Sequence, residues 1–117
     1  MKGHKETGAK VTFDAFDYLV RVTFTDDVVA ARVKIDSIVG KYPGGPAGAI
    51  HSWADDNPVS YLFLPYDARP STIAHECWHV VRQMLRICGA ELENEVVAYH
   101  LGWLVGKVHD IQKRLRK

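Results

Sequence analysis

The chain has 117 residues, of which 47% are hydrophobic and 25% charged, and its formal net charge is +1. This length fits one domain, residues 1–117, with a single core, and the near-neutral charge argues against nucleic acid as a partner. The sequence contains no run of 18 apolar residues, and its opening MKGHKETGAK lacks the apolar stretch of a signal peptide. We therefore expect no membrane partner and a cytoplasmic protein, in the host cytoplasm if a phage encodes it.

The first half of the chain predicts strands and one helix. YLVRVTF at 18–24 alternates as a half-buried strand does, and VTFDAF at 11–16 is either a second strand or a lead-in. The segment 26–40 has the pattern of an amphipathic helix that is acidic at its start. AIHSW at 49–53 and VSYLFLP at 59–65 flank the turn residues ADDNP, which predicts two antiparallel strands.

Two long helices are predicted at the end of the chain, from about Pro70 to Cys88 and from about Glu93 to Leu115, with the break at Gly89. The fold class is therefore α+β, with a short antiparallel sheet, an N-terminal helix and two long C-terminal helices. Cys77 and Cys88 are separated by about 16 Å of helix rise, so we expect both thiols to be reduced.

The first of these helices carries the motif HECWH at 75–79. At about 100° per residue, His75 and His79 lie opposite the apolar stripe, so they are not buried core histidines. The two remaining interpretations are a metal site and two surface histidines on a polar face. The apolar stripe consists of Ile73, Cys77, Val80, Val81, Met84 and Cys88.

Histidines at positions i and i+4 of a helix can present two imidazoles to one zinc ion. Glu76 is rotated by about 100° from His75, which lets it reach an attacking water without being a ligand itself. The pattern therefore predicts Zn²⁺ as the cofactor, His75 and His79 as metal ligands, and Glu76 as the general base.

A catalytic zinc needs a third protein ligand, and the second helix offers Glu95. Taken alone, Glu95 reads better as a partner of the helix dipole, whereas together with the two histidines it reads as a ligand. Glu91, Glu93 and His100 are the alternatives near the same helix junction, and we prefer Glu95 because of its neighbours on one helix face. These are Ala98, Tyr99, Gly102 and Gly106, and the glycines predict close approach of the histidine helix.

HECWH together with EVVA at 95–98 resembles the zincin metallopeptidases of the gluzincin-like type, in which HExxH is followed by a downstream E-x-x-A. IAHECWHVV and ENEVVAYHLGWL are most similar to small zinc metallopeptidases of tailed phages and prophages. The resemblance covers about residues 58–104 and implies a minimal zincin-like domain, with His75, His79 and Glu95 as zinc ligands and Glu76 as general base.

For the group that stabilises the oxyanion, our first candidate is Tyr99, and His51, His100 and Arg82 are the next candidates. The alternative for Tyr99 is packing with its hydroxyl at the surface. The strand at 59–65 is either the partner of an extended peptide substrate or an ordinary internal strand. Trp53, Trp78 and Trp103 are interpreted as core or interface aromatics rather than a substrate cage.

The predicted function is a zinc-dependent metallopeptidase, a hydrolase whose partner is a protein or peptide substrate. The alternative is a non-catalytic, zinc-containing binding or regulatory protein of phage origin. A weaker alternative has no metal and uses the apolar stripe of the last helix to form a homodimer.

Overall fold

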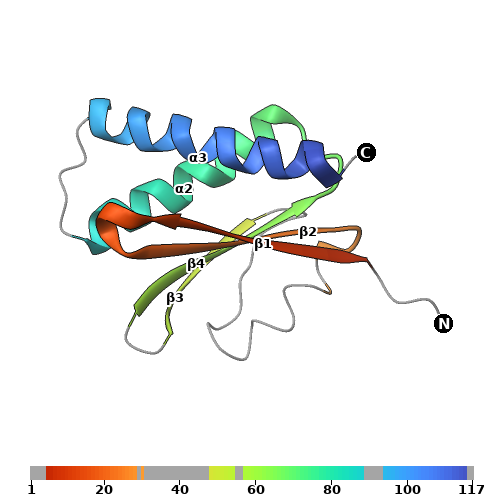
Figure 1. Cartoon of the computed structure of the whole chain (residues 1–117), viewed down its shortest axis with the longest axis horizontal. Coiled ribbons are helices and arrows are strands. Elements are labelled where there is room, and N and C mark those ends of the chain that lie inside the picture. The colour runs from red at the N-terminus through yellow and green to blue at the C-terminus, as the bar shows by residue number, and fades with distance from the viewer. Residues whose placement is uncertain (1–4, 29, 31–47, 55–56, 89–93, 116–117) are drawn as a thin grey trace.

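A computed structural model describes residues 5–28, 30, 48–54, 57–88 and 94–115, with the backbone alone described for 48–54, 57 and 58. The architecture is α+β: a four-stranded sheet with two long helices packed on one face (Figure 1). The elements in chain order are β1 (Glu6–Phe13), β2 (Tyr18–Thr25), β3 (Gly48–Ala54), β4 (Asn57–Pro65), α2 (Pro70–Ile87) and α3 (Asn94–Leu115). Both predicted C-terminal helices are confirmed.

The sheet has the strand order β1-β2-β4-β3, and the expectation of a purely antiparallel sheet is wrong. β1 with β2 and β3 with β4 are antiparallel, but β2 and β4 are parallel, with Leu19 opposite Val59 and Thr25 opposite Pro65. A parallel pair needs a long crossover, and here the connection from β2 to β4 also contains the edge strand β3. β4 is thus an internal strand, which contradicts its suggested pairing with a substrate peptide.

The described chain starts with a β-hairpin rather than with a helix. VTFDAF divides between strand and turn: residues up to Phe13 belong to β1, and Asp14–Phe16 form a 3-10 helix that ends at Asp17 in the left-handed region (φ 51). The helix predicted at 26–40 follows this hairpin. Val28 and Ala30 are helical, and the other residues of 29–40 lie outside the described part of the chain.

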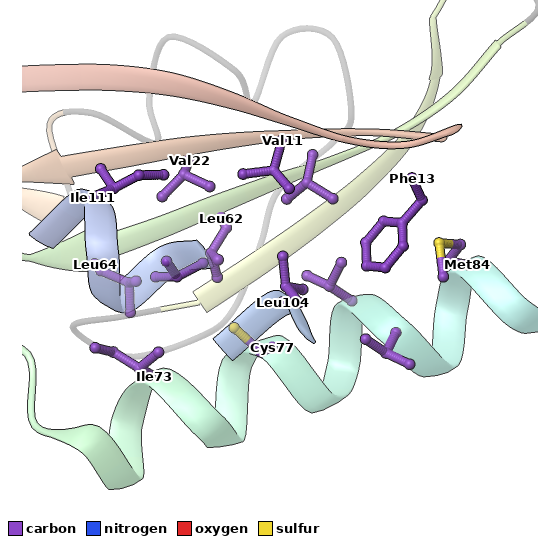
Figure 2. Close-up of a cluster of buried hydrophobic side chains, with 14 of the residues drawn as sticks. Val11, Phe13, Val22, Leu62, Leu64, Ile73, Cys77, Met84, Leu104 and Ile111 are labelled. Atoms are coloured by element: carbon purple, nitrogen blue, oxygen red, sulfur yellow. The ribbon is translucent and has the colours of Figure 1, made fainter. Parts of the chain in front are cut away.

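The core lies between the sheet and the two helices (Figure 2), which show the predicted stripes. On α2 the predicted stripe is buried except for Cys88, which follows the last helical residue and is exposed; Leu85 joins the core instead. On α3, Leu104, Val108 and Ile111 are buried against the same core. Because this stripe faces the sheet, it is not available as the dimer surface considered above.

The relative placement of the two helices is set by Gln112 near the end of α3. Its Nε2 donates to the carbonyl oxygens of Ala68 (2.9 Å) and Tyr66 (3.2 Å), directly before α2 begins. The end of α3 therefore lies beside the start of α2, and the helices run antiparallel, with α2 over β3 and β4 and α3 reaching β1.

The two cysteines are free thiols, as expected, with Cys77 buried and Cys88 exposed. Among the helices described, none combines the length and the apolar character needed to cross a lipid bilayer.

We predict that Gln112→Ala lowers the free energy of unfolding by about 2 kcal/mol, because it leaves two backbone carbonyls beside the core without their donor. Denaturant titration of the parent and variant measures the difference. Lys113→Ala, at the exposed neighbouring position, is the control and should change it by less than about 0.5 kcal/mol. Equal stability of parent and Gln112→Ala would show that this bond pair does not hold the helices in register.

Candidate metal centre

The sequence of α2 favours a helix because it has a suitable first residue and separates apolar from polar side chains on two faces. Pro70 occupies the first helical position, where the missing N–H has no intrahelical partner to lose. One side of the helix is fixed to the core through Ile73 and Val80, both buried. The opposite side carries His75 and His79, which are both exposed. The predicted placement of the histidine pair outside the apolar stripe is confirmed.

The two imidazoles converge on a common point. His75 Nε2 and His79 Nε2 are 3.3 Å apart, and the ring centroids are 4.8 Å apart with the planes at 83°. Two nitrogens that each lie 2.0–2.1 Å from a tetrahedral zinc are separated by about 3.3 Å. The same separation also permits a hydrogen bond between the rings, so the distance fits a shared proton as well as a shared metal ion.

Glu76 completes a compact group with the two histidines. The potential ligand atoms of His75, Glu76 and His79 all lie within 4.8 Å of one another. Glu76 is only 8% exposed, and its buried Oε1 has no hydrogen-bond partner among the described residues. Buried polar atoms are nearly always hydrogen-bonded, so this orphaned oxygen indicates a missing partner. A bound cation or a reacting water would supply one.

Glu76 lies at one margin of the buried side of α2, and Leu85 lies at the other margin. α2 packs on α3, on β4 and on the edge strand β3.

Cys77 lies next to Glu76 in the sequence but is unsuited to metal binding. Burial raises the pKa of its thiol to about 12, and the negative charge of Glu76 contributes in the same direction. Metal ligation by cysteine requires the thiolate. The buried Cys77 is thus a packing residue, and the ligand donors on α2 are the two imidazoles and the carboxylate.

Trp78 and Arg82 border the histidine pair on the exposed face of α2. The Trp78 ring meets the His79 ring edge-on at 5.1 Å and 70°, and the Arg82 guanidinium lies 4.8 Å above the Trp78 ring. Arg82 therefore lies beside the histidines, on Trp78, and its role as an alternative oxyanion-stabilising group stays a prediction. Trp78 is 37% exposed and was not predicted as part of the site, although its position outside the apolar stripe is a signal for it.

The structure does not bring Glu95 into this group. Counted from the Gln112–Ala68 contact at 1.5 Å per residue, His79 lies about 16 Å along α2 and Glu95 about 26 Å along α3. Glu95 is exposed in the first turn of α3, roughly 10 Å past His79 along the helix axes and on the neighbouring helix. In this position its carboxylate suits the helix dipole. Its role as third ligand stays a prediction.

The prediction that α2 approaches α3 closely at Gly102 and Gly106 is wrong. A Cβ placed on Gly102 or Gly106 would meet no atom within 4 Å, so both residues face open space. The whole face that carries Glu95 and Tyr99 is exposed, because the opposite face of α3 packs on the sheet.

Tyr99 is also outside the histidine group. It is 75% exposed, and its ring meets His100 edge-on at 5.4 Å. His100 turns toward the β1–β2 hairpin: its Nδ1 lies 2.8 Å from the Val96 carbonyl oxygen, and its ring contacts Phe16. The predicted role of Tyr99 in oxyanion stabilisation stays a prediction, while the side chain of His51 and residues Glu91 and Glu93 lie outside the described parts.

Comparisons with known proteins place this chain in no family. No protein-family model matches the sequence, and neither a curated protein nor a solved structure matches it significantly.

We predict that the purified protein binds about one zinc per chain and that His75→Ala and His79→Ala each abolish this binding, because either change removes one of two converging ligands. Zinc titration with a competing chromophoric chelator measures the affinity. His109→Ala, an exposed histidine on α3, is the control and should bind as the parent does.

The same titration tests the third ligand. The register of α2 and α3 predicts that Glu95→Ala keeps the zinc affinity of the parent. A loss of about tenfold or more in Glu95→Ala would instead support the ligand set expected from the motif, with α3 moving toward His79 when zinc binds.

Proposed function

We propose that His75 and His79 hold a zinc ion and that the protein is a zinc-dependent hydrolase of peptide bonds. The observation that carries this proposal is the 3.3 Å separation of the two Nε2 atoms beside a buried carboxylate with an unpartnered oxygen. Two surface histidines without a function would give no reason for the neighbouring Glu76 oxygen to be buried without a hydrogen-bond partner.

The donor set fits zinc. Imidazole nitrogens are among the usual protein ligands of catalytic zinc, which keeps an open coordination position, and Glu76 is the general base in this proposal rather than one of the ligands. Both histidines are exposed, so the site is accessible to a substrate from the outer face of α2. A zinc ion bound here would polarise a peptide carbonyl and make a nearby water more acidic.

In this proposal Glu76 accepts the proton of the attacking water. Glu76 follows His75 directly and precedes His79 by three positions, and its carboxylate lies beside both imidazoles. Oε1 has no hydrogen-bond partner among the described residues, so it is free to accept a hydrogen bond and then the proton from a water held beside it. After attack, the same carboxyl group can pass the proton to the leaving amine.

The second candidate is a zinc-containing binding protein without catalysis. It is favoured by one observation: in the described part of the chain, the proposed electrophile Tyr99 lies outside the histidine group and is 75% exposed. The two candidates share the metal ligands and differ in what Glu76 does, so a change of Glu76 alone separates them.

We predict that Glu76→Gln retains zinc and lowers peptide hydrolysis by roughly 10² to 10⁴, the range for a lost general base. Hydrolysis is measured by mass spectrometry of a mixed peptide library incubated with the zinc-loaded protein. Asp67→Asn, at an exposed carboxylate before α2, is the matched control and should cut as the parent does. Equal hydrolysis by Glu76→Gln and the parent contradicts the role of Glu76, and a zinc-loaded parent that cuts no peptide favours the binding protein.

A second measurement tests whether Glu76 is kept for function. Because Oε1 is buried without a donor, Glu76→Met should raise the melting temperature of the metal-free protein, as a similar volume is filled without an unsatisfied polar atom. A lower melting temperature than the parent would mean that Glu76 stabilises the fold and is not held there at a cost.

A further inference from the structure

A groove runs along the other side of the molecule, between α3 and the edge strand β1. Its larger part has a volume of about 640 Å³ and is lined by four cations and one acidic residue. The cations are Lys10 on β1 and Lys107, Lys113 and Arg114 on α3, and the acid is Asp110. The groove is thus strongly positive, although the chain as a whole carries a formal charge of only +1.

The groove continues into a second, aromatic part. A pocket of about 170 Å³ shares Thr12 and Trp103 with the larger part, and its other lining residues are Phe13, Asp14, Ala15, Phe16, Tyr99 and His100, so that one carboxylate borders its aromatic rings. Tyr99 is 75% exposed and Trp103 38%, so two of the three large exposed apolar side chains of the described residues border this groove. The Trp103 ring lies 4.7 Å from that of Phe13, and Lys107 Nζ lies 5.4 Å from its centre.

The floor of the groove is an unpaired strand edge. β1 pairs with β2 on one side, and no other described strand pairs with it. The Asp26 N–H donates to the Lys5 carbonyl, which fixes the phase of the antiparallel ladder: odd-numbered residues of β1 point their backbone groups toward β2. The N–H and C=O groups of Gly8, Lys10 and Thr12 therefore point outward along the free edge.

We propose that this groove binds an extended acidic peptide segment of a partner protein, which adds to β1 as a further strand. The alternating outward N–H and C=O groups match a peptide backbone. The cations match carboxylates, and the aromatic pocket matches one apolar side chain at the end of the segment.

Other occupants fit less well. A second copy of this chain pairing through β1 would bring two positively charged grooves together, and charged residues on edge strands disfavour such self-association. A single-stranded nucleic acid could use the cations and stack on Trp103, but it has no alternating backbone donors and acceptors to satisfy β1.

The proposal is tested with a fluorescein-labelled octapeptide in which one Phe is followed by alternating Glu and Val, and fluorescence anisotropy measures its binding. The paired change Lys107→Glu with Arg114→Glu should weaken binding by about tenfold or more, because two attractive contacts become repulsive. Arg86→Glu, an exposed cation on α2, is the matched control and should stay within about twofold of the parent. The same peptide with Lys in place of Glu should not bind.

The strand edge is tested with Thr12→Pro, which removes an outward N–H without touching the ladder to β2, against Thr12→Val, which keeps that N–H. We expect about tenfold weaker binding for Thr12→Pro and unchanged binding for Thr12→Val. Circular dichroism must show that both variants are folded. If Thr12→Pro does not fold, the proposal is tested by the Lys107→Glu, Arg114→Glu variant alone. His75→Ala should bind as the parent does, which separates this surface from the metal centre.

Three results would overturn the proposal. One is the absence of saturable peptide binding up to about 1 mM. Another is equal binding by the parent and the Lys107→Glu, Arg114→Glu variant. The third is tighter binding of a thymidine octanucleotide than of the peptide, with Thr12→Pro neutral for both, which would assign the groove to nucleic acid.

Discussion

Burial of one side of α2 against the sheet and α3 is the constraint on which the rest of the structure depends. It fixes the rotation of the helix about its axis, since Ile73 and Met84 allow no other face to point inward. His75 and His79 are then displayed together on the outer face, and Glu76 falls at the margin of the buried arc. The grouping of these three side chains, the candidate metal centre, is therefore a direct consequence of helical periodicity and core packing.

Elements with a strong local pattern could be predicted from the sequence, whereas their partners could not. Both C-terminal helices and the strands β2, β3 and β4 lie close to where alternation and helical stripes put them, whereas β1 begins at Glu6 and shares only its last three residues with the strand considered at 11–16. The parallel pairing of β2 with β4 has no local signal, because it joins Leu19 to Val59 across a crossover. The turn inside VTFDAF was also not predicted, since aromatic residues on both sides of Asp14 continue the apolar pattern of a strand.

In the candidate site, too, the part that lies on one helix could be predicted from the sequence, and the part that depends on a second helix could not. The spacing of His75 and His79 predicts their convergence because both lie on one helix, so no tertiary information is needed. Glu95 lies on another helix, and its distance from His79 depends on a register that is set by Gln112 at the far end of α3. The glycines of α3 misled for a similar reason: small residues permit close packing on either side of a helix but do not say which side has a neighbour.

The two edges of the sheet give the molecule two different sides. The candidate metal centre lies on α2, which contacts β3 and β4, and the basic and aromatic groove lies along the β1 edge. The candidate metal centre and the groove have no residue in common. Under the function proposed above, a weakly selective hydrolytic site would gain specificity from a second surface that holds the partner, because tethering raises the effective concentration of the bond to be cut. In a domain of 117 residues, whose single core leaves little room for a deep substrate cleft, our two proposals would place recognition on the strand edge and chemistry on the helix.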